Sequence, residues 1–212
     1  MDRVDAILMA SGFSSRFGDE NKLLIPFRGK PLVRHTLELT ARRSGAEEPT
    51  LMEESGSNSS FFHRVFFIAA DTRVAAQAAD LPVTIIRNHH PDLGQRESIR
   101  LGVSASEAEH YLFFPCDQPL LDKAILTLLL DHRGEGRIVE PVFLGNPFSP
   151  TLFSSSFREE LLNLGPGEHG RDIKRRHRDL VVGVEIADPS ILEDIDDPET
   201  LKRLNGVNNG KN

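Results

Sequence analysis

The sequence predicts a single α/β domain with a three-layer, Rossmann-like architecture, in which helices cover both faces of a mostly parallel sheet. Two observations favour this fold class. Short runs rich in Val, Ile and Phe alternate with segments of helical periodicity along the 212 residues, and these runs are almost continuously apolar. Strands of that kind are buried on both faces, which requires helices on each side of the sheet. A chain of this length can bury one sizeable core and is hardly long enough for two.

The apolar runs are expected to form the strands of this sheet. They are Ala6–Ala10, Val65–Ala70, Val83–Arg87, Tyr111–Phe114, Arg137–Leu144 and Leu180–Ile186. In an open α/β sheet, ligands bind outside the carboxyl ends of the strands. The loops that follow Ala10 and Phe114 are therefore the first places to look for a functional site.

Helical periodicity between these runs predicts the covering helices. They are one that begins at Pro31 and ends at Gly45, then Thr72–Ala79, Arg96–Glu107 and one that Asp122 caps. Residues 46–60 are acidic and rich in Ser and Gly, so we expect a surface insertion there. Residues 205–212 are expected to form a flexible tail, which leaves 1–204 as one domain.

Composition excludes several classes of protein. The net charge of −7 argues against general nucleic-acid binding, where basic surface dominates. No apolar run approaches the roughly 20 residues that span a bilayer, so no membrane partner is expected. The single cysteine, Cys116, cannot form an internal disulfide and is typical of a reducing cytoplasm. We therefore expect a cytoplasmic protein.

The clearest functional signal lies in the segment Val4–Lys22. Its apolar run ends at Ser11-Gly12 in a loop of small polar residues, which presents Arg16 and Lys22 before the chain becomes apolar again. Small residues let backbone N–H groups approach a phosphate closely, and fixed cations add opposite charge. The pattern predicts a site for a polyanion such as a triphosphate. The alternative is an ordinary strand-to-helix turn that carries surface cations.

Local charge favours the polyanion site. Between Arg16 and Arg34 there are five basic and two acidic residues, in a chain that is acidic overall. A basic mouth on an acidic body is typical of a protein that binds a small anionic substrate.

This loop departs from two common phosphate fingerprints. Five residues separate Gly12 from Gly18, and leucine follows Lys22, whereas a Walker A loop has four residues between its glycines and Ser or Thr after its lysine. The dinucleotide fingerprint G-x-G-x-x-G is also missing. The expected ligand is therefore held by another type of phosphate loop.

A second signal is an aspartate placed directly after a strand. Asp117 follows the run Tyr111–Phe114 and has Pro115 and Pro119 two residues before and after it, which restricts the backbone on both sides. A rigid carboxylate beside a phosphate loop can place Mg²⁺, an ion that uses one or two protein carboxylates together with substrate phosphates. The alternative is that Asp117 only ends the strand or caps a turn.

These segments together resemble a known family. SGFSSRFGDENKLL followed by FPCDQPLL is similar to the nucleotidyltransferases that attach a nucleotide to the molybdenum cofactor, especially the molybdenum cofactor cytidylyltransferases. The resemblance continues in the same order through Gly145–Pro147, Gly167–Arg171 and Asp194–Glu199, so it spans nearly the whole chain.

The resemblance implies a fold of the nucleotide-diphospho-sugar transferase type and an activity. The activity is Mg²⁺-dependent transfer of CMP from CTP to the terminal phosphate of molybdopterin, with release of pyrophosphate. It also implies transient contact with a molybdoenzyme or its chaperone. The N-terminal half is then nucleotide-binding, and residues 137–204 form the acceptor-binding part.

The same resemblance implies roles for individual residues. Lys22, Arg16 and Asp117 match the catalytic positions, and Asp117 is also the expected metal ligand. The implied nucleotide-binding residues are Ala10, Ser11, Gly12, Phe13, Ser14, Arg16, Lys22 and Ser98. The implied acceptor-binding residues are Asn146, Pro147, His169, Gly170 and Arg171.

The end of the chain offers further carboxylates. Asp197 precedes Pro198 and is expected to cap a helix, which leaves Asp194 and Asp196 as candidate metal ligands beside Asp117. The alternative is that they are solvated acids at a helix start. Gly167–Arg171 likewise reads either as an acceptor contact or as a glycine turn before a basic helix.

The choice of base and acceptor stays open at the sequence level. Guanylyltransferase relatives usually carry two adjacent glycines where this chain has Ser11-Gly12, so the Ser11 side chain favours cytosine. The alternatives are guanylyl transfer to the same cofactor, cytidylyl transfer to a sugar- or methylerythritol-type phosphate, and a nucleotide-binding regulator without catalysis. Gly94–Ser98 matches the serine-rich loop of the family only loosely.

Overall fold

The computed structural model describes residues 2–12, 17–18, 20–41 and 61–206. Its main sheet has eight strands, and a separate hairpin joins two more. The strands of the main sheet are β1 (Val4–Ala10), β4 (Arg64–Ala69), β5 (Thr84–Arg87), β6 (His110–Pro115), β7 (Ile138–Phe143), β8 (Asn146–Pro147), β9 (Thr151–Ser154) and β10 (Val181–Glu185). The hairpin consists of β2 (Pro26–Phe27) and β3 (Lys30–Pro31).

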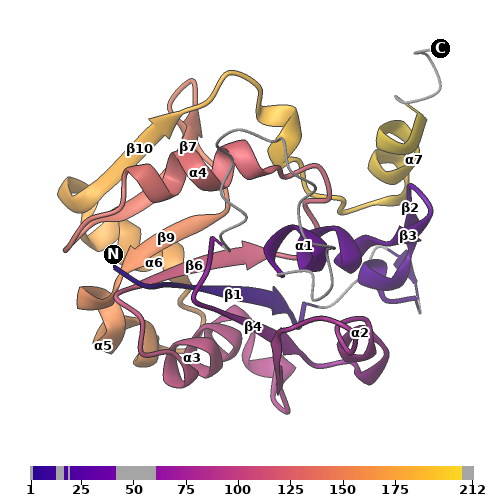
Figure 1. Cartoon of the computed structure of the whole chain (residues 1–212), viewed down its shortest axis with the longest axis horizontal. Helices are drawn as coiled ribbons and strands as arrows, with labels where there is room; N and C mark the ends of the chain where they lie inside the picture. The colour runs from indigo at the N-terminus through magenta and orange to yellow at the C-terminus, as the bar shows by residue number, and fades with distance from the viewer. Residues whose placement is uncertain (1, 13–16, 19, 42–60, 207–212) are drawn as a thin grey trace, which may run out of the picture.

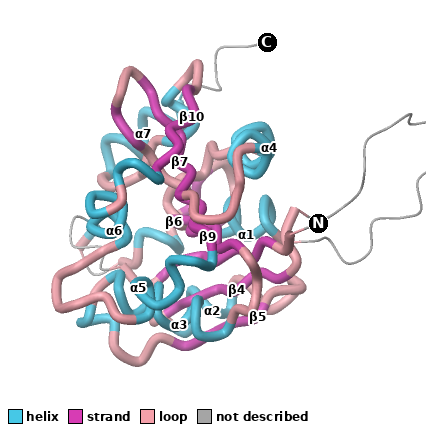
Figure 2. The backbone as a smooth tube through the Cα atoms, turned by 90° about the vertical axis from the view of Figure 1, so that its left-hand side faces the viewer, coloured by secondary structure: helices cyan, strands magenta, loops and turns pink. Residues whose placement is uncertain are grey.

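Helices cover both faces of this sheet (Figure 1). They are α1 (Leu32–Thr40), α2 (Thr72–Ala76), α3 (Gln95–Ala105), α4 (Lys123–Asp131), α5 (Arg158–Leu162), α6 (Gly170–Arg176) and α7 (Pro198–Gly206). Figure 2 shows α1 and α4 on one side of the strands and α6 on the other. The three-layer arrangement that the sequence predicts is confirmed.

The strand order is β10-β7-β9-β6-β1-β4-β5, with β8 paired to β7. β1 runs parallel to both β4 and β6, and β10 runs parallel to β7. Within the described part of the main sheet, every antiparallel pairing involves β8 or β9. The sheet is therefore mostly parallel, and its central strands end at one common edge.

Alternation along each strand divides the core into two layers. In β1, Ala6 and Leu8 face the layer packed by α1, α2 and α4, whereas Ile7 faces the layer packed by α3, α5 and α6. All three side chains are fully buried. Successive side chains of a strand point to opposite faces, so a strand buried on both sides must be apolar at every position.

Aspartates begin several of the helices. The Asp122 carboxylate accepts a hydrogen bond from the Ile125 N–H (3.1 Å) at the start of α4. Asp197 accepts one from the Thr200 N–H (2.8 Å) in the first turn of α7, so the expected cap at Asp197 is confirmed. Each such cap satisfies one of the N–H groups that a helix start leaves without a partner.

The predicted elements occur with changes at their ends. Each of the predicted strands overlaps an observed one, and β6 is longer by one residue at each end. α2 ends at Ala76, because turns follow it, and α3 begins one residue early, at Gln95. α7 continues to Gly206, so the expected tail starts later than residue 205.

β9 is absent from the sequence prediction. It has only four residues, it follows Pro150 and it runs straight into Ser155, so no local pattern marks it. Its residues are nonetheless all buried, because β9 fills the gap between β6 and β7. The predicted end of the first helix, at Gly45, is wrong, because α1 ends at Thr40 and Ala41 is already in an extended conformation. The expected insertion at 46–60 lies outside the described residues.

Within the described part of the chain, no helix has the length and apolar character that crossing a membrane requires.

Candidate active site

The first cavity lies where the central strands end. Met9 of β1 is paired with Pro115 of β6, so the loops after these strands leave the sheet side by side. The cavity between them has a volume of about 310 Å³. Its lining includes Ser11, Gly12, Lys22, Gly94, Gln95, Ser98 and Asp117. The glycine loop and the aspartate that the sequence singles out thus share one cleft.

Lys22 sits between two carboxylates in this cleft. Its ammonium donates to Oδ2 of Asp117 (2.7 Å) and to Oδ1 of Asp196 (2.6 Å). Burial lowers the pKa of Lys22, but the two carboxylates outweigh this effect and hold the pKa above its ordinary value. Lys22 therefore stays charged, and it is available to a ligand that offers oxygens of higher charge.

Local structure places this lysine. Lys22 opens a short 3₁₀ turn, Lys22–Leu24, whose start is capped by Asn21 through the Leu23 N–H (3.1 Å). The Asn21 amide also donates to Asp71, at the end of β4 (3.4 Å). Leu23 is buried against the core. The turn is fixed from both sides, so Lys22 is directed into the cleft.

The C-terminal segment reaches the same place from far along the chain. The Ile195 N–H donates to the backbone oxygen of Asp117 (2.9 Å), and the Gln118 amide donates to that of Leu192 (2.8 Å). Ile195 is buried in the core. These contacts bring Asp194 and Asp196 to the Asp117 loop, where the sequence analysis expects them as candidate metal ligands.

Asp194, close to the Asp117 loop, has a raised pKa. The surrounding protein removes much of the water near its carboxyl group, although part of the residue remains exposed, and this raises the pKa of Asp194 to about 6. The charge of Asp117 raises it further and that of Asp196 adds to the effect, whereas Gln118 and Lys22 oppose it. Several negative charges are thus crowded around one lysine.

This carboxylate group fits a cation such as Mg²⁺. Oδ1 of Asp117 is buried and has no hydrogen-bond partner among the residues that the structure describes, so those residues leave this acceptor unsatisfied. Carboxylate oxygens are the ligands that Mg²⁺ prefers, and it needs only one or two of them beside substrate phosphates. Among the described residues, no group of three or more His, Cys, Asp or Glu side chains is placed to hold a metal ion, so a Mg²⁺ site here would need substrate phosphates to complete it.

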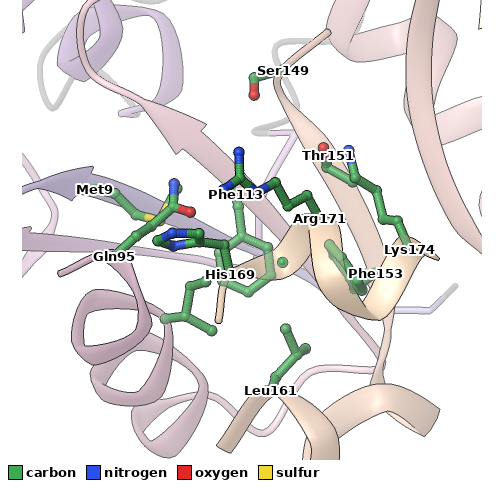
Figure 3. A pocket seen from close by; sticks show the side chains of 12 residues that line it. Met9, Gln95, Phe113, Ser149, Thr151, Phe153, Leu161, His169, Arg171 and Lys174 are labelled. Atoms are coloured by element: carbon green, nitrogen blue, oxygen red, sulfur yellow. The ribbon is translucent and has the colours of Figure 1, made fainter. Parts of the chain in front are cut away.

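A second cavity, of about 400 Å³, opens beside the first (Figure 3). One wall is apolar and comes from β6, β9 and α3. The other comes from the start of α6 and is cationic. The lining residues are Met9, Gln95, Ile99, Phe113, Ser149, Thr151, Phe153, Leu161, His169, Gly170, Arg171 and Lys174. Met9 and Gln95 line both cavities, so the two adjoin each other.

The structure brings together most of the predicted site residues that it describes. Ser11, Gly12, Lys22, Ser98 and Asp117 line the first cavity, and Ala10 is the buried last residue of β1 just below it. His169, Gly170 and Arg171 line the second. Phe13, Ser14 and Arg16 lie outside the described residues.

Asn146 and Pro147 do not line either cavity. They form β8, an exposed strand paired to the end of β7, and the Asn146 amide donates to backbone oxygens of its own hairpin. Their contact with an acceptor, which the family resemblance implies, remains a prediction.

Sequence reasoning missed several lining residues. Gln95 is the first residue of α3, directly after Gly94, and its place at a helix start beside a glycine was a signal that could have identified it. Lys174 lies three residues after Arg171 and thus on the same face of α6. Thr151 and Phe153 belong to the unpredicted strand β9 and gave no signal.

These features define a class of protein. An α/β domain with Ser11 and Gly12 at the end of β1, a lysine held by aspartates and an adjoining cationic cavity suits an enzyme that joins two anionic substrates, as nucleotidyltransferases do. The chain belongs to the family described as the MobA-like NTP transferase domain, whose family model matches residues 6–181. It is thus an enzyme of the nucleotidyltransferase type.

Two individual relatives match nearly the whole chain at low sequence identity. Nicotine blue oxidoreductase of Paenarthrobacter nicotinovorans is 27% identical over 211 residues, which are 95% of this chain and 96% of that protein. Molybdenum cofactor guanylyltransferase of Shewanella sp. (strain MR-4) is 22% identical over 214 residues, 95% of each.

Solved structures share the fold across the whole chain. A nucleotidyl transferase from Methanothermobacter thermautotroptrophicus superposes with a TM-score of 0.76 at 20% identity and covers 96% of both chains. A Mycobacterium tuberculosis protein solved with manganese superposes with a TM-score of 0.69 at 19% identity, over 95% of this chain and 97% of that one. The predicted fold type is confirmed by this likeness.

Proposed function

We propose that this protein transfers a nucleoside monophosphate from a nucleoside triphosphate to the terminal phosphate of a molybdopterin-type acceptor. An acceptor phosphate oxygen attacks the α-phosphorus, the bond from that phosphorus to the β-phosphate oxygen breaks, and pyrophosphate leaves. The observation that carries this proposal is the pair of adjoining cavities, one holding Lys22 and Asp117 and the other Arg171. Two anionic substrates can thus be bound next to each other.

The protein's part in this reaction is alignment and neutralisation of charge. Lys22 exchanges its carboxylate partners for the α-phosphate, where it offsets the charge that develops during attack. Arg16, which lies outside the described residues, holds the outer phosphates. A bound Mg²⁺ on Asp117 and Asp196 would supply further neutralisation of phosphate charge. A phosphate monoester is already a nucleophile, so the reaction needs no covalent enzyme intermediate.

Acceptor binding is assigned to the second cavity. Arg171 donates no hydrogen bond to any residue that the structure describes, and Figure 3 shows its guanidinium extending from α6 into the cavity. A guanidinium matches phosphate geometry with paired donors. Phe113 and Phe153 give the cavity an apolar floor on which a flat ring system can rest.

The choice of nucleotide has two candidates. The Ser11 side chain, which donates to the Ile68 backbone oxygen (3.3 Å), favours cytidylyl transfer by comparison with the paired glycines of guanylyltransferases. The similarity to a molybdenum cofactor guanylyltransferase over nearly the whole chain favours guanylyl transfer instead. Both act on the same acceptor, and both use the cleft in the same way.

Pyrophosphate release tests this proposal. The protein is mixed with molybdopterin, Mg²⁺ and each of CTP, GTP, ATP and UTP in turn, and pyrophosphate is measured against nucleotide concentration. Saturable release that requires the acceptor, with CTP or GTP preferred, supports the proposal, and EDTA should abolish it. Release of pyrophosphate with a sugar phosphate or methylerythritol phosphate, and not with molybdopterin, would show that the acceptor is one of these compounds. If no acceptor supports pyrophosphate release, the remaining interpretation is a nucleotide-binding regulator without catalysis.

A further inference from the structure

A buried ion pair lies in the wall of the second cavity. Glu140 is on β7 and only 6% of the residue is exposed, and the Lys174 ammonium donates to its Oε2. Lys174 is one-fifth exposed at its side chain and lines the cavity. Buried pairs of this kind add little stability compared with apolar residues of the same size, so stability alone is a weak reason for one.

The other cations of α6 are committed elsewhere. Arg175 pairs with Asp172 on the helix surface (3.3 Å), and Arg176 pairs with Glu160 and Glu168 (3.2 and 2.7 Å). Arg175 does not line the cavity and its side chain is 61% exposed. Within α6, the cavity therefore receives cations from only two described positions, Arg171 and Lys174.

Glu140 explains how two cations can stand one helical turn apart. Like charges at this spacing repel each other. The Glu140 carboxylate cancels the charge of Lys174 when no ligand is present, which removes the repulsion with Arg171. An ammonium has three N–H donors, so a single partner leaves others for the cavity. In Figure 3 the Lys174 side chain extends from α6 toward Thr151, and the Arg171 guanidinium extends across the cavity toward the side where Met9 and Gln95 lie.

We propose that Lys174 is a second cationic contact for the anionic group of the acceptor and acts together with Arg171. This inference rests on the proposed function, because it takes the second cavity as the acceptor site. The ligand chemistry is that of a phosphate monoester, whose three terminal oxygens can accept from the guanidinium and the ammonium together.

The test measures binding of a simple probe without nucleotide. Methyl phosphate is titrated into the protein, and the affinity is read from the NMR signal of the His169 imidazole, identified by its loss in His169→Gln. Since Lys174→Met alone would leave Glu140 buried and unpaired, the reference is Glu140→Gln, which keeps the shape and removes the charge. In that background, adding Lys174→Met should weaken methyl phosphate binding about tenfold.

A matched variant distinguishes a specific contact at Lys174 from a general effect of positive charge on methyl phosphate binding. Arg175→Met in the Glu140→Gln background removes one cation from the same helix, outside the cavity. Its methyl phosphate affinity should stay within a factor of two of the reference, by an order-of-magnitude estimate for an exposed charge. Equal affinity in all three variants would overturn the inference, and so would equal loss in both double variants.

The failure of this inference is distinguishable from failure of the proposed function. The binding measurement needs no turnover, and pyrophosphate release needs no particular contact at Lys174. If Lys174→Met weakens methyl phosphate binding but the protein releases no pyrophosphate, the anion site is supported and the proposed nucleotidyl transfer is wrong. Pyrophosphate release with unchanged binding rejects the role of Lys174 alone.

Discussion

In the proposed function, the chemistry of the first cavity depends on Lys22. It is held by Asp117 and Asp196, which lie 95 and 174 positions away in the sequence. Because both partners are carboxylates, a phosphate or a divalent cation can compete for the same contacts. Two carboxylates on one ammonium leave an excess of negative charge, which a divalent cation can neutralise.

Lys22→Ala should lower kcat for pyrophosphate release on the order of 10²–10³-fold, the scale for losing one preorganised donor to a developing negative charge. The measurement is steady-state release with saturating acceptor. Lys202→Ala is the control, since Lys202 is an exposed lysine of α7 away from both cavities. Turnover close to that of the unmodified protein in a folded Lys22→Ala variant would remove Lys22 from the mechanism.

Asp71 gives a pH dependence with a defined sign. Hydrogen bonding to Arg73 (2.7 Å) lowers the pKa of Asp71 to about 2 from its ordinary 3.8. A lowered folded-state pKa stabilises the fold above the unfolded-state pKa, and this contribution is lost as the pH falls from about 3.8 toward 2.

Asp71→Asn keeps Oδ1 as the cap on the Arg73 N–H, and it removes the charge together with the Oδ2 acceptor of the Arg73 guanidinium and the Asn21 amide. We expect it to lower the free energy of unfolding by about 1 kcal/mol at pH 7, after discounting the shift for solvent screening. Urea unfolding at pH 7, 5 and 3 should show the difference from the unmodified protein unchanged between 7 and 5 and smaller at 3. A difference that grows on acidification would contradict the assignment.

At the scale of elements, α3 connects the core to both cavities. Its first turn supplies Gln95 and Ser98, and its middle packs on β1 through Gly102. A Cβ built on Gly102 would lie 2.4 Å from Cγ2 of Ile7. Only glycine lets the helix approach the strand this closely, so this residue sets the position of the helix start.

Gly102→Ala tests this packing, because two effects oppose each other. Alanine favours a helix over glycine by about 1 kcal/mol. Overpacking against a buried strand costs about 1–3 kcal/mol. We expect a net loss of stability on the order of 1 kcal/mol in urea unfolding, because Ile7 is fully buried and cannot move aside.

The control for this substitution is Ser104→Ala, an exposed change in the same helix that should be neutral or slightly stabilising. Ile7→Ala removes the clashing Cγ2, so Gly102→Ala should cost less stability in an Ile7→Ala background than in the unmodified protein, whereas in an Ile7→Val background, which keeps a γ-methyl group, its cost should stay nearly the same. An unchanged or more stable Gly102→Ala protein would contradict the packing argument.

Strands and helix starts were predictable where the residues of the segment itself determine its structure. Continuous apolar runs predicted β1, β4 and β6, and aspartate caps predicted the starts of α4 and α7. β9 was not predictable, because a four-residue strand is defined by the neighbours it pairs with and not by its own sequence.

At the scale of the whole molecule, the site is assembled from segments that the sheet topology brings together. The end of β1, the end of β6 and the segment around Ile195 meet at the first cavity, and β9 with α6 completes the second. The sequence predicted that Lys22, Asp117 and Asp196 belong to one site. It could not predict that Lys22 bridges the two carboxylates, or that Lys174 faces Glu140, because such pairings depend on side-chain packing across elements.

The proposed assignment of the nucleotide to the first cavity and the acceptor to the second predicts that a substitution can change the KM for one substrate and not for the other. Arg171→Ala should raise KM for molybdopterin about tenfold or more, the scale for a lost charge-assisted contact, and leave KM for the nucleotide nearly unchanged. Steady-state pyrophosphate release with each substrate varied in turn measures both constants. Arg175→Ala, on the outer face of the same helix, is the control and should change neither. A rise confined to the nucleotide KM would reverse the assignment of the cavities.

A crystal structure of the protein with Mg²⁺ and a non-hydrolysable analogue of CTP or GTP is the most direct test of the central claim. The account predicts the α-phosphate on Lys22, the metal on Asp117, the base beside Ser11 and Gly12, and a second cavity still open beside Arg171. A nucleotide bound elsewhere, with Lys22 still paired to Asp117 and Asp196, would contradict it.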